Sequence, residues 1–229
     1  MARRTPDQSD VAVLCPMRIE HDRVCREIDR AGLGRTRVVQ TGIGRDAVLR
    51  SLESIRRPSL VILAGAAGGL LACEDLPPIA RVVDEHGGAW TPFAADPSGL
   101  TLIGVDSIIS TPGDKRALAA RTGAAIVDME CHVFAARCEE MGVAWSVVRG
   151  VSDTPEETLP QEVLGWITPS GDTRTGRAIM DMVRRPRLVG HIAGVVRRSN
   201  RVLPLVGRRV VEIIREWQSE HAGASGSKA

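Results

Sequence analysis

The sequence predicts a three-layer α/β/α sandwich, with helices on both sides of a mostly parallel sheet. Short apolar runs, typical of buried strands, alternate with segments whose apolar residues repeat at helical spacing. Glycine or proline separates many of these segments, and this alternation is the pattern of α/β folds. The chain has 229 residues, 43% of them hydrophobic, which is enough for one core in one domain.

The elements follow in order from these patterns. The first strand is predicted at 11–15, and the first helix at 20–31, where Val24 and Ile28 share a face and Gly32 ends the pattern. The same reasoning predicts further strands at 37–40, 60–64, 79–83, 101–105, 124–127 and 144–148. It predicts further helices at 45–56, 115–121, 131–141 and 173–183.

The last third of the chain is rich in arginine. Residues 184–215 hold nine arginines and one acid, Glu212, among apolar residues at mainly helical spacing. Two interpretations stay open for this basic segment. It forms two or three surface helices that cap the sheet with a solvated face, or it rests as an amphipathic segment on an anionic membrane surface.

Composition excludes several classes of function. A net charge of +2 and 3% aromatic residues argue against a nucleic-acid binder. The longest weakly polar run, 59–72, is too short to span a membrane. The five cysteines have no metal-type spacing, and residues 1–10 hold no apolar signal stretch. We therefore expect reduced thiols, no metal site and a cytoplasmic location.

The segment 126–132 carries the first candidate site. Asp128, Met129 and Glu130 come at the end of a buried strand, just before a helix, and ligands of α/β sheets bind at that edge. A carboxylate there can accept hydrogen bonds from two sugar hydroxyls, and a thioether can pack against a ribose ring. The alternative is an ordinary strand-to-helix turn with an acid at the helix N-terminus.

The segment 147–153 carries the second candidate site. A buried strand ends in Arg149, and Ser152 and Asp153 follow. An aspartate that is partly removed from water has an accessible protonated form near neutral pH, and it could give its proton to a leaving group. The alternative is a salt bridge between Arg149 and Asp153 that holds the loop.

Three further features lie near the same predicted sheet edge. Residues 65–69 are glycine-rich and include Ala66 and Gly68, and their backbone amides could approach a ligand or hold an anion. Considered alone, this run predicts a tight packed turn. Gly44 closes a Gly-x-Gly segment, and Glu20 stands at a helix start, where it also suits a simple N-terminal carboxylate.

Taken in order, these pieces resemble the nucleoside phosphorylase and nucleosidase superfamily. The matching motifs cover residues 11–159 and read Met-x-x-Glu at 17–20, Gly-x-Gly at 42–44, Gly-x-Ala-Gly-Gly-Leu at 65–70, Val-Asp-Met-Glu at 127–130 and Val-Val-Arg-x-x-Ser-Asp at 147–153. The resemblance implies a twisted, mixed central sheet flanked by helices. It also implies an enzyme that cleaves the N-glycosidic bond of a purine nucleoside.

The resemblance also implies roles for individual residues. Asp153 would protonate the departing purine at N7, with Ser152 and Arg149 positioning it. Glu20 would activate water, and Glu130 would bind the ribose hydroxyls. The other residues implied at the substrate are Met129 along the sugar, together with Asp128, Ala66, Gly68 and Gly44.

The sequence departs from the pattern of this superfamily in two places. The bacterial purine phosphorylases hold phosphate with an Arg and a Ser, where this chain has Leu63 and Ala66. The difference favours water as the acceptor, although phosphate held by Arg18, Arg45 or a neighbouring subunit stays open. The loop 110–123, which contributes base contacts in the nucleosidases, is short here and lacks the usual Phe, which leaves Trp90, Phe93 and Trp166 as candidates to stack on the base.

A narrower resemblance links the chain to the hopanoid-associated branch of this superfamily. It rests on 115–124, 127–130, Leu-Pro at 159–160, Arg-Pro at 185–186 and the Arg-rich C-terminus. It implies adenine release from adenosylhopane, a lipid-linked nucleoside, by phosphorolysis or hydrolysis without a cofactor other than phosphate. It also implies a homo-oligomer that touches the membrane through 184–215.

Two other functions stay open. One is a soluble nucleosidase for methylthioadenosine or a futalosine-like compound, and the other is a catalytically idle ligand-binding homologue.

The resemblance divides the chain into four parts. These are a flexible N-terminus (1–10), a phosphorylase-like catalytic domain (11–183), basic C-terminal helices packed on or extending it (184–221) and a disordered tail (222–229).

Overall fold

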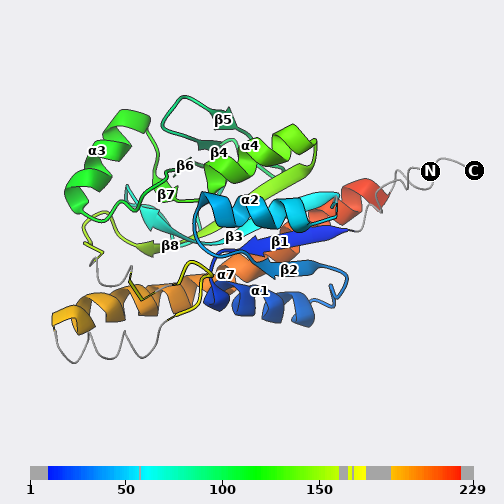
Figure 1. Ribbon diagram of the computed structural model, residues 1–229, viewed down its shortest axis with the longest axis horizontal. Coiled ribbons are helices and arrows are strands. Elements are labelled where there is room, and N and C mark those ends of the chain that lie inside the picture. Colours follow the sequence, from blue (N-terminus) through cyan, green and yellow to red (C-terminus); the bar gives the residue numbers. More distant parts are fainter. Residues whose placement is uncertain (1–9, 57, 160–164, 167, 174–186, 223–229) are drawn as a thin grey trace, which may run out of the picture.

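The computed structural model describes residues 10–56, 58–159, 165–166, 168–173 and 187–222, and the side chains of these except 187–192 and 222. A twisted eight-stranded sheet lies between helices (Figure 1). The strands are β1 (Val11–Cys15), β2 (Arg37–Gln40), β3 (Leu60–Gly69), β4 (Ile79–Val83), β5 (Ala89–Trp90), β6 (Leu100–Gly104), β7 (Ile126–Asp128) and β8 (Ala144–Asp153). The helices are α1 (Arg18–Arg30), α2 (Arg45–Ser54), α3 (Pro112–Thr122), α4 (Cys131–Met141) and α7 (Arg187–Ala222).

The sheet is mixed, as expected. Its order is β2-β1-β3-β7-β6-β4-β5, and β8 pairs with β3 beside this path. The pairs of β3 with β7 and of β4 with β5 are antiparallel, whereas β1–β2, β1–β3, β3–β8, β4–β6 and β6–β7 are parallel. The predicted fold class is therefore confirmed.

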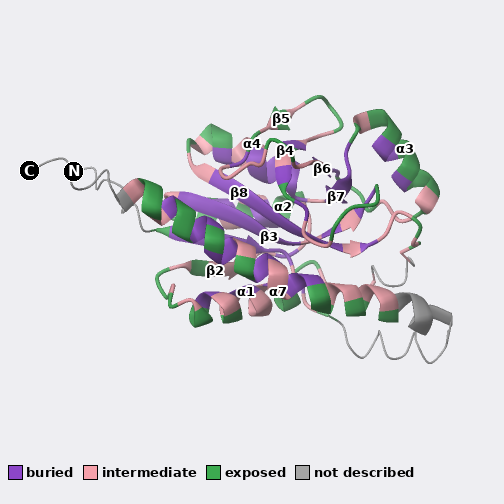
Figure 2. Ribbon diagram, turned by 180° about the vertical axis from the view of Figure 1, so that it is seen from behind, coloured by how far each residue is buried: buried purple, intermediate pink, exposed green. Residues whose placement is uncertain are grey.

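Alternating side chains of the strands build a core on each face of the sheet. Val11, Val13 and Cys15 of β1 pack with α1 and α7 on one face. Ala12 and Leu14 pack with α2 and α4 on the other. Figure 2 shows the buried central strands between these two helical layers. A smaller cluster joins α3 to β6 and β7 at one end of the sheet.

Two strands run further than the sequence predicted. β3 continues to Gly69 and β8 to Asp153, and they pair from Leu60 opposite Ala144 to Gly68 opposite Asp153, with one irregularity after Ala67. The run 65–69 is thus a strand and not the predicted turn. Its small residues suit a place where neighbouring groups approach the backbone closely.

The C-terminal segment also differs from its prediction. Where two or three helices were expected, one helix of 36 residues, α7, spans Arg187–Ala222 with Pro204 inside it. Its buried side chains are Val202, Leu203, Val206, Val210, Val211, Ile213, Ile214 and Trp217. A side chain at Gly150 of β8 would place its Cβ 2.8 Å from Val202, so this helix packs directly on the sheet.

Several expectations fall on residues outside the described part. These are the helix at 173–183, all but its first residue, and the terminal segments 1–9 and 223–229. Among the described residues, no helix is long and apolar enough to cross a membrane.

Candidate active site

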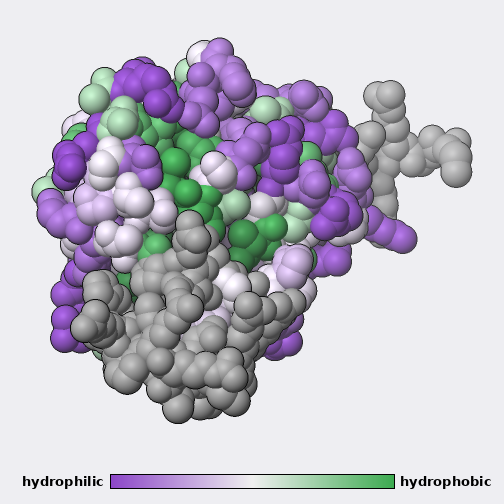
Figure 3. Space-filling model, turned by 60° about the vertical axis from the view of Figure 1, so that its left-hand side comes forward, coloured by the Kyte–Doolittle hydropathy of each residue, from purple (hydrophilic) through white to green (hydrophobic). Residues whose placement is uncertain are grey.

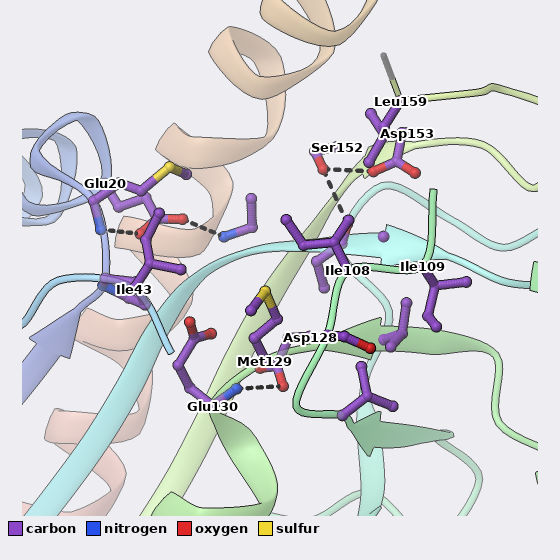
Figure 4. Close-up of a pocket in the computed structure, with 18 residues that line it drawn as sticks. Glu20, Ile43, Ile108, Ile109, Asp128, Met129, Glu130, Ser152, Asp153 and Leu159 are labelled. Atoms are coloured by element: carbon purple, nitrogen blue, oxygen red, sulfur yellow. Dashed lines mark hydrogen bonds between the residues drawn. The ribbon is translucent and has the colours of Figure 1, made fainter. Parts of the chain in front are cut away.

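A cavity of about 190 Å³ opens at the edge of the sheet where β3, β7 and β8 end. Figure 4 shows Glu20 and Glu130 to one side of it and Ser152 with Asp153 to the other. The sequence-predicted residues that line it are Glu20, Ala66, Gly68, Asp128, Met129, Glu130, Ser152 and Asp153. Segments up to 133 residues apart in the chain therefore meet here, because the parallel strands β1, β3 and β8 bring their ends together and β7, antiparallel to β3, ends beside them.

Two predicted residues support this cavity from outside it. The backbone N–H of Gly44 donates to Glu130 Oε1 over 2.8 Å. Arg149 is wholly buried, and its Nε and Nη2 lie 2.6 and 2.5 Å from Asp128 Oδ2. Its Nη2 also lies 3.5 Å from Glu130 Oε2.

The alternative considered for this segment, a salt bridge between Arg149 and Asp153, is therefore wrong. Both residues belong to β8, and four residues of an extended strand span about 13 Å. A salt bridge between them would have needed a loop at this point. Arg149 instead compensates the carboxylates that follow β7.

Glu130 is a weaker acid than an ordinary carboxyl group. Burial and the nearby Asp128 raise its pKa from 4.5 to about 7, although Arg149 and the Gly44 N–H oppose the shift. Only 5% of the residue is exposed. Near neutral pH this group is consequently divided between its two protonation states.

Glu20 is held at both oxygens. Oε2 accepts from the N–H of Met17, at the start of α1, and Oε1 accepts from the N–H of Ala66 in β3, over 2.8 and 2.7 Å. Burial raises its pKa, although Arg149 and these two N–H groups oppose the shift. The first contact is the helix N-terminal role considered for Glu20, and the second fixes its carboxylate at the cavity.

The glycine at position 65 permits this arrangement. A Cβ there would lie 2.5 Å from Glu20 Oε1 and 2.8 Å from Arg149 Nη1, closer than real Cβ contacts allow. The glycine-rich run thus lets a carboxylate and a guanidinium group approach the strand, and Ala66 adds its amide to the contact.

Asp153 has a partner that sequence reasoning missed. Ser152 Oγ donates to its Oδ1 over 2.9 Å, and Lys115 Nζ donates to its Oδ2 over 2.5 Å. Lys115 is wholly buried and comes from α3. A signal was present, because Lys115 and Lys228 are the two lysines of a chain with 30 basic residues. A lone internal lysine in a chain that otherwise uses arginine points to a site that arginine does not suit.

The rest of the cavity lining is mostly apolar. Its lining includes Ile43, Val105, Ile108, Ile109 and Leu159, and Ile108 is 38% exposed. Figure 3 turns forward the side of the molecule that carries α3 and shows hydrophobic surface gathered near its centre. A ligand here would meet polar groups at the sheet edge and hydrocarbon elsewhere.

The three aromatic candidates for the base do not line this cavity in the described structure. Trp90 packs on the core at β4 and β5, and the Phe93 ring meets Trp217 edge-on, with centroids 5.0 Å apart. Trp166 is buried. We therefore assign none of the three to a stacking role.

The two arginines considered as phosphate ligands also lie elsewhere. Leu63, which stands where a phosphate-binding Arg was considered, is wholly buried in the core. Arg18 pairs with Asp172 over 2.8 Å and Arg45 with Asp106 over 3.2 Å, and neither arginine is among the described residues that line the cavity. Within the described residues, no group of three His, Cys, Asp or Glu side chains could hold a metal ion.

Comparisons with known proteins agree with this fold. Residues 99–184 match the model of the Phosphorylase superfamily, whereas no curated protein matches the chain. Similar solved structures include the 5′-methylthioadenosine/S-adenosylhomocysteine nucleosidase of Helicobacter pylori. It has a TM-score of 0.60 and 16% identity, over 90% of this chain and 98% of that one.

Two other structures have the same fold. The futalosine hydrolase of Helicobacter pylori has a TM-score of 0.63 and 14% identity, over 90% of this chain and 99% of that one. A putative 5′-methylthioadenosine/S-adenosylhomocysteine nucleosidase of Francisella philomiragia has a TM-score of 0.60 and 13% identity over the same shares. The family match covers residues 99–184, and these solved structures show that the chain shares their fold.

Proposed function

We propose that this enzyme cleaves the N-glycosidic bond of a purine nucleoside and releases the base. The observation that carries the proposal is the meeting of Glu20, Glu130 and Asp153 in one largely apolar cavity. Each of the three carboxyl groups has different partners there. Such differences let chemically equal groups take different roles in one reaction.

Glu130 and Met129 form the sugar side of the proposed site. An ionised Glu130 accepts hydrogen bonds from two ribose hydroxyls, and Met129 packs against the ring. As the bond to the base breaks, the ribose gains positive charge, which nearby carboxylates stabilise. Because the pKa of Glu130 is about 7, ribose binding should strengthen as the pH rises through neutrality.

Glu20 is the proposed general base. Its raised pKa makes its carboxylate a better proton acceptor than an ordinary one. It takes a proton from water, whose oxygen then bonds to C1′ of the ribose. Asp153 delivers a proton to the purine, because a protonated purine leaves more easily than an anionic one.

We further propose water, and not phosphate, as the acceptor. This choice is supported by Leu63, which faces the core, and by Arg18 and Arg45, which pair with acids away from the cavity. A phosphate-holding cation would otherwise be needed within reach of C1′. The site needs no cofactor for this reaction.

The substrate we favour is a 5′-substituted adenosine with an apolar substituent, such as adenosylhopane. The isoleucines at 43, 108 and 109 and Leu159 would suit such a group. The exposed arginines of α7, at 197, 201, 208 and 215, would suit an anionic membrane surface on the cytoplasmic side. The second candidate is a methylthioadenosine or futalosine nucleosidase, which the solved structures of this fold favour.

The first test is base release from adenosine, methylthioadenosine and adenosines with long apolar 5′-substituents, with and without phosphate. Adenine released without phosphate supports the proposal, and a requirement for phosphate with ribose 1-phosphate as product contradicts hydrolysis. Asp153→Asn should lose most turnover, while Asp106→Asn, at an exposed position, is the control. No base released from any nucleoside would overturn the function itself.

Further assays test the choice of substrate, the membrane contact and the oligomeric state. A preference for long apolar substituents favours the lipid-linked nucleoside, and equal rates on methylthioadenosine favour the second candidate. Deleting α7 is no test, because its apolar face belongs to the core. Replacing Arg197, Arg201 and Arg208 with glutamine should instead abolish sedimentation with phosphatidylglycerol vesicles, and retained sedimentation would contradict membrane contact. Gel filtration with light scattering tests the expected homo-oligomer.

A further inference from the structure

Lys115 Nζ is hydrogen-bonded to three acceptors that all belong to one short stretch of chain. Its Nζ donates to Asp153 Oδ2 over 2.5 Å, to the carbonyl of Thr154 over 2.7 Å and to the carbonyl of Glu157 over 3.1 Å. An ammonium group has three N–H donors, and a neutral amine has two. The three acceptors therefore fit the charged form of lysine, because each of its three N–H donors has a partner.

The surroundings of this pair are otherwise closed. The Lys115 side chain is wholly buried and that of Asp153 is 2% exposed. A second ion pair, Glu157 with Arg198, 2.7 Å apart, adjoins this pair, because the carbonyl of Glu157 accepts from Lys115. The neighbouring Asp114 is turned toward Thr111. Asp153 lines the cavity, whereas Lys115 stands behind it, outside the lining.

This arrangement bears on where the proton for the base is stored. Both oxygens of Asp153 accept hydrogen bonds, from Ser152 and from Lys115. The ionisable proton closest to a base in the cavity is therefore on Lys115 Nζ, one carboxylate away. An arginine could hold the same charge, but it does not release a proton in proteins.

We propose that Lys115 is a positioning residue that also supplies, through Asp153, the proton that the leaving base takes up. The inference rests on the proposed cleavage reaction. As the bond from C1′ to the base breaks, its electron pair goes to the purine. Lys115 Nζ passes a proton to the Asp153 carboxylate, and Asp153 passes that proton on to the purine. The products of this step are a neutral base, an unchanged carboxylate and a neutral amine, which regains its proton from water before the next turnover.

Turnover of three variants tests the inference, with adenosine as the probe. Lys115→Met removes the proton, Lys115→Arg keeps the charge without a releasable proton, and Arg116→Met, an exposed neighbour on α3, is the matched control. We expect kcat to fall about 100-fold in both Lys115 variants, with KM within about threefold because Lys115 does not line the cavity. The control should keep its rate.

The pH profile adds a result that a purely structural role would not give. In Lys115→Met the proton must come from Asp153 alone, so the basic limb of kcat/KM should move to lower pH. Wild-type kcat in Lys115→Arg would show that charge alone suffices and would overturn the proton supply. An unshifted basic limb in Lys115→Met would overturn it too. Wild type without base release would instead refute the proposed reaction.

A second measurement avoids variants of Lys115 that fail to fold. The chain has two lysines, so labelling with ¹⁵N-lysine gives two side-chain signals in nuclear magnetic resonance, and Lys228→Met assigns them. We expect slowly exchanging ammonium protons for Lys115 in the wild type and a shifted signal in Asp153→Asn. Rapid exchange of these protons, or the same signal in both proteins, would contradict the three hydrogen bonds of Lys115 Nζ.

Discussion

Glu130 should make the stability of the folded protein depend on pH. Its pKa is raised from 4.5 to about 7 in the folded state and returns to an ordinary value on unfolding. Between these pH values the folded state binds more protons than the unfolded state, so the free energy of unfolding falls as the pH rises. The contribution of Glu130 is fully present below pH 4.5 and is lost through pH 7. This difference corresponds to about 3 kcal/mol.

The variant Glu130→Gln removes this ionisation and keeps the size of the side chain. We expect its stability relative to wild type to increase by about 3 kcal/mol between pH 4.5 and pH 8. Urea unfolding at both pH values measures it, and Glu74→Gln, at an exposed position, is the control. If wild type and Glu130→Gln differ equally at both pH values, the raised pKa of Glu130 is wrong.

Three other substitutions test the packing around the site. Gly65→Ala should lower kcat by about 100-fold, because its Cβ would displace the Glu20 carboxylate; an unchanged rate would contradict the close approach. Arg149→Met should destabilise by about 3–5 kcal/mol in urea unfolding, because it leaves buried carboxylates without their cation. Ile214→Ala should cost about 2–5 kcal/mol, since α7 belongs to the core, and a loss below 0.5 kcal/mol would contradict that placement.

Local patterns were sufficient for most of the fold. Strands such as 11–15 and 37–40 match their predicted bounds, because a short apolar run between polar or glycine-rich ends is typical of a strand. The run 65–69 was misjudged because glycine is common in turns and also in strands that other groups approach closely. Pairing with β8 decides between the two, and such long-range pairing has no signature in the run itself.

The α7 segment shows a different limit. Its arginines and apolar residues repeat at helical spacing, which indicates helices without saying where they end. Pro204 lies inside this helix, although a proline in a helix interior ordinarily kinks or breaks the helix. Burial of Val206, Val210 and Ile214 against the sheet supplies the stability that offsets an internal proline.

The sequence predicted which residues form the candidate site, but not which side chains pair with one another. Motif order brought Glu20, Glu130 and Asp153 to one edge of the sheet, where the structure has them. The partners of Arg149 and Asp153 depend on the length of β8 and on the position of α3. A residue such as Lys115 acts through contacts between distant elements, so its lone occurrence was the available signal.

The two halves of the site differ in net charge, and the difference suits the proposed reaction. On the proposed sugar side, the carboxyl groups of Glu20, Asp128 and Glu130 share one guanidinium group, that of Arg149. Burial and this excess of acid raise the pKa of Glu130 in the resting protein, and positive charge developing on a ribose would offset the excess. On the proposed base side, Asp153 is matched one to one by Lys115. A base that leaves as a neutral molecule needs no excess charge there, but it does need a proton, and the proposed source of that proton is Lys115.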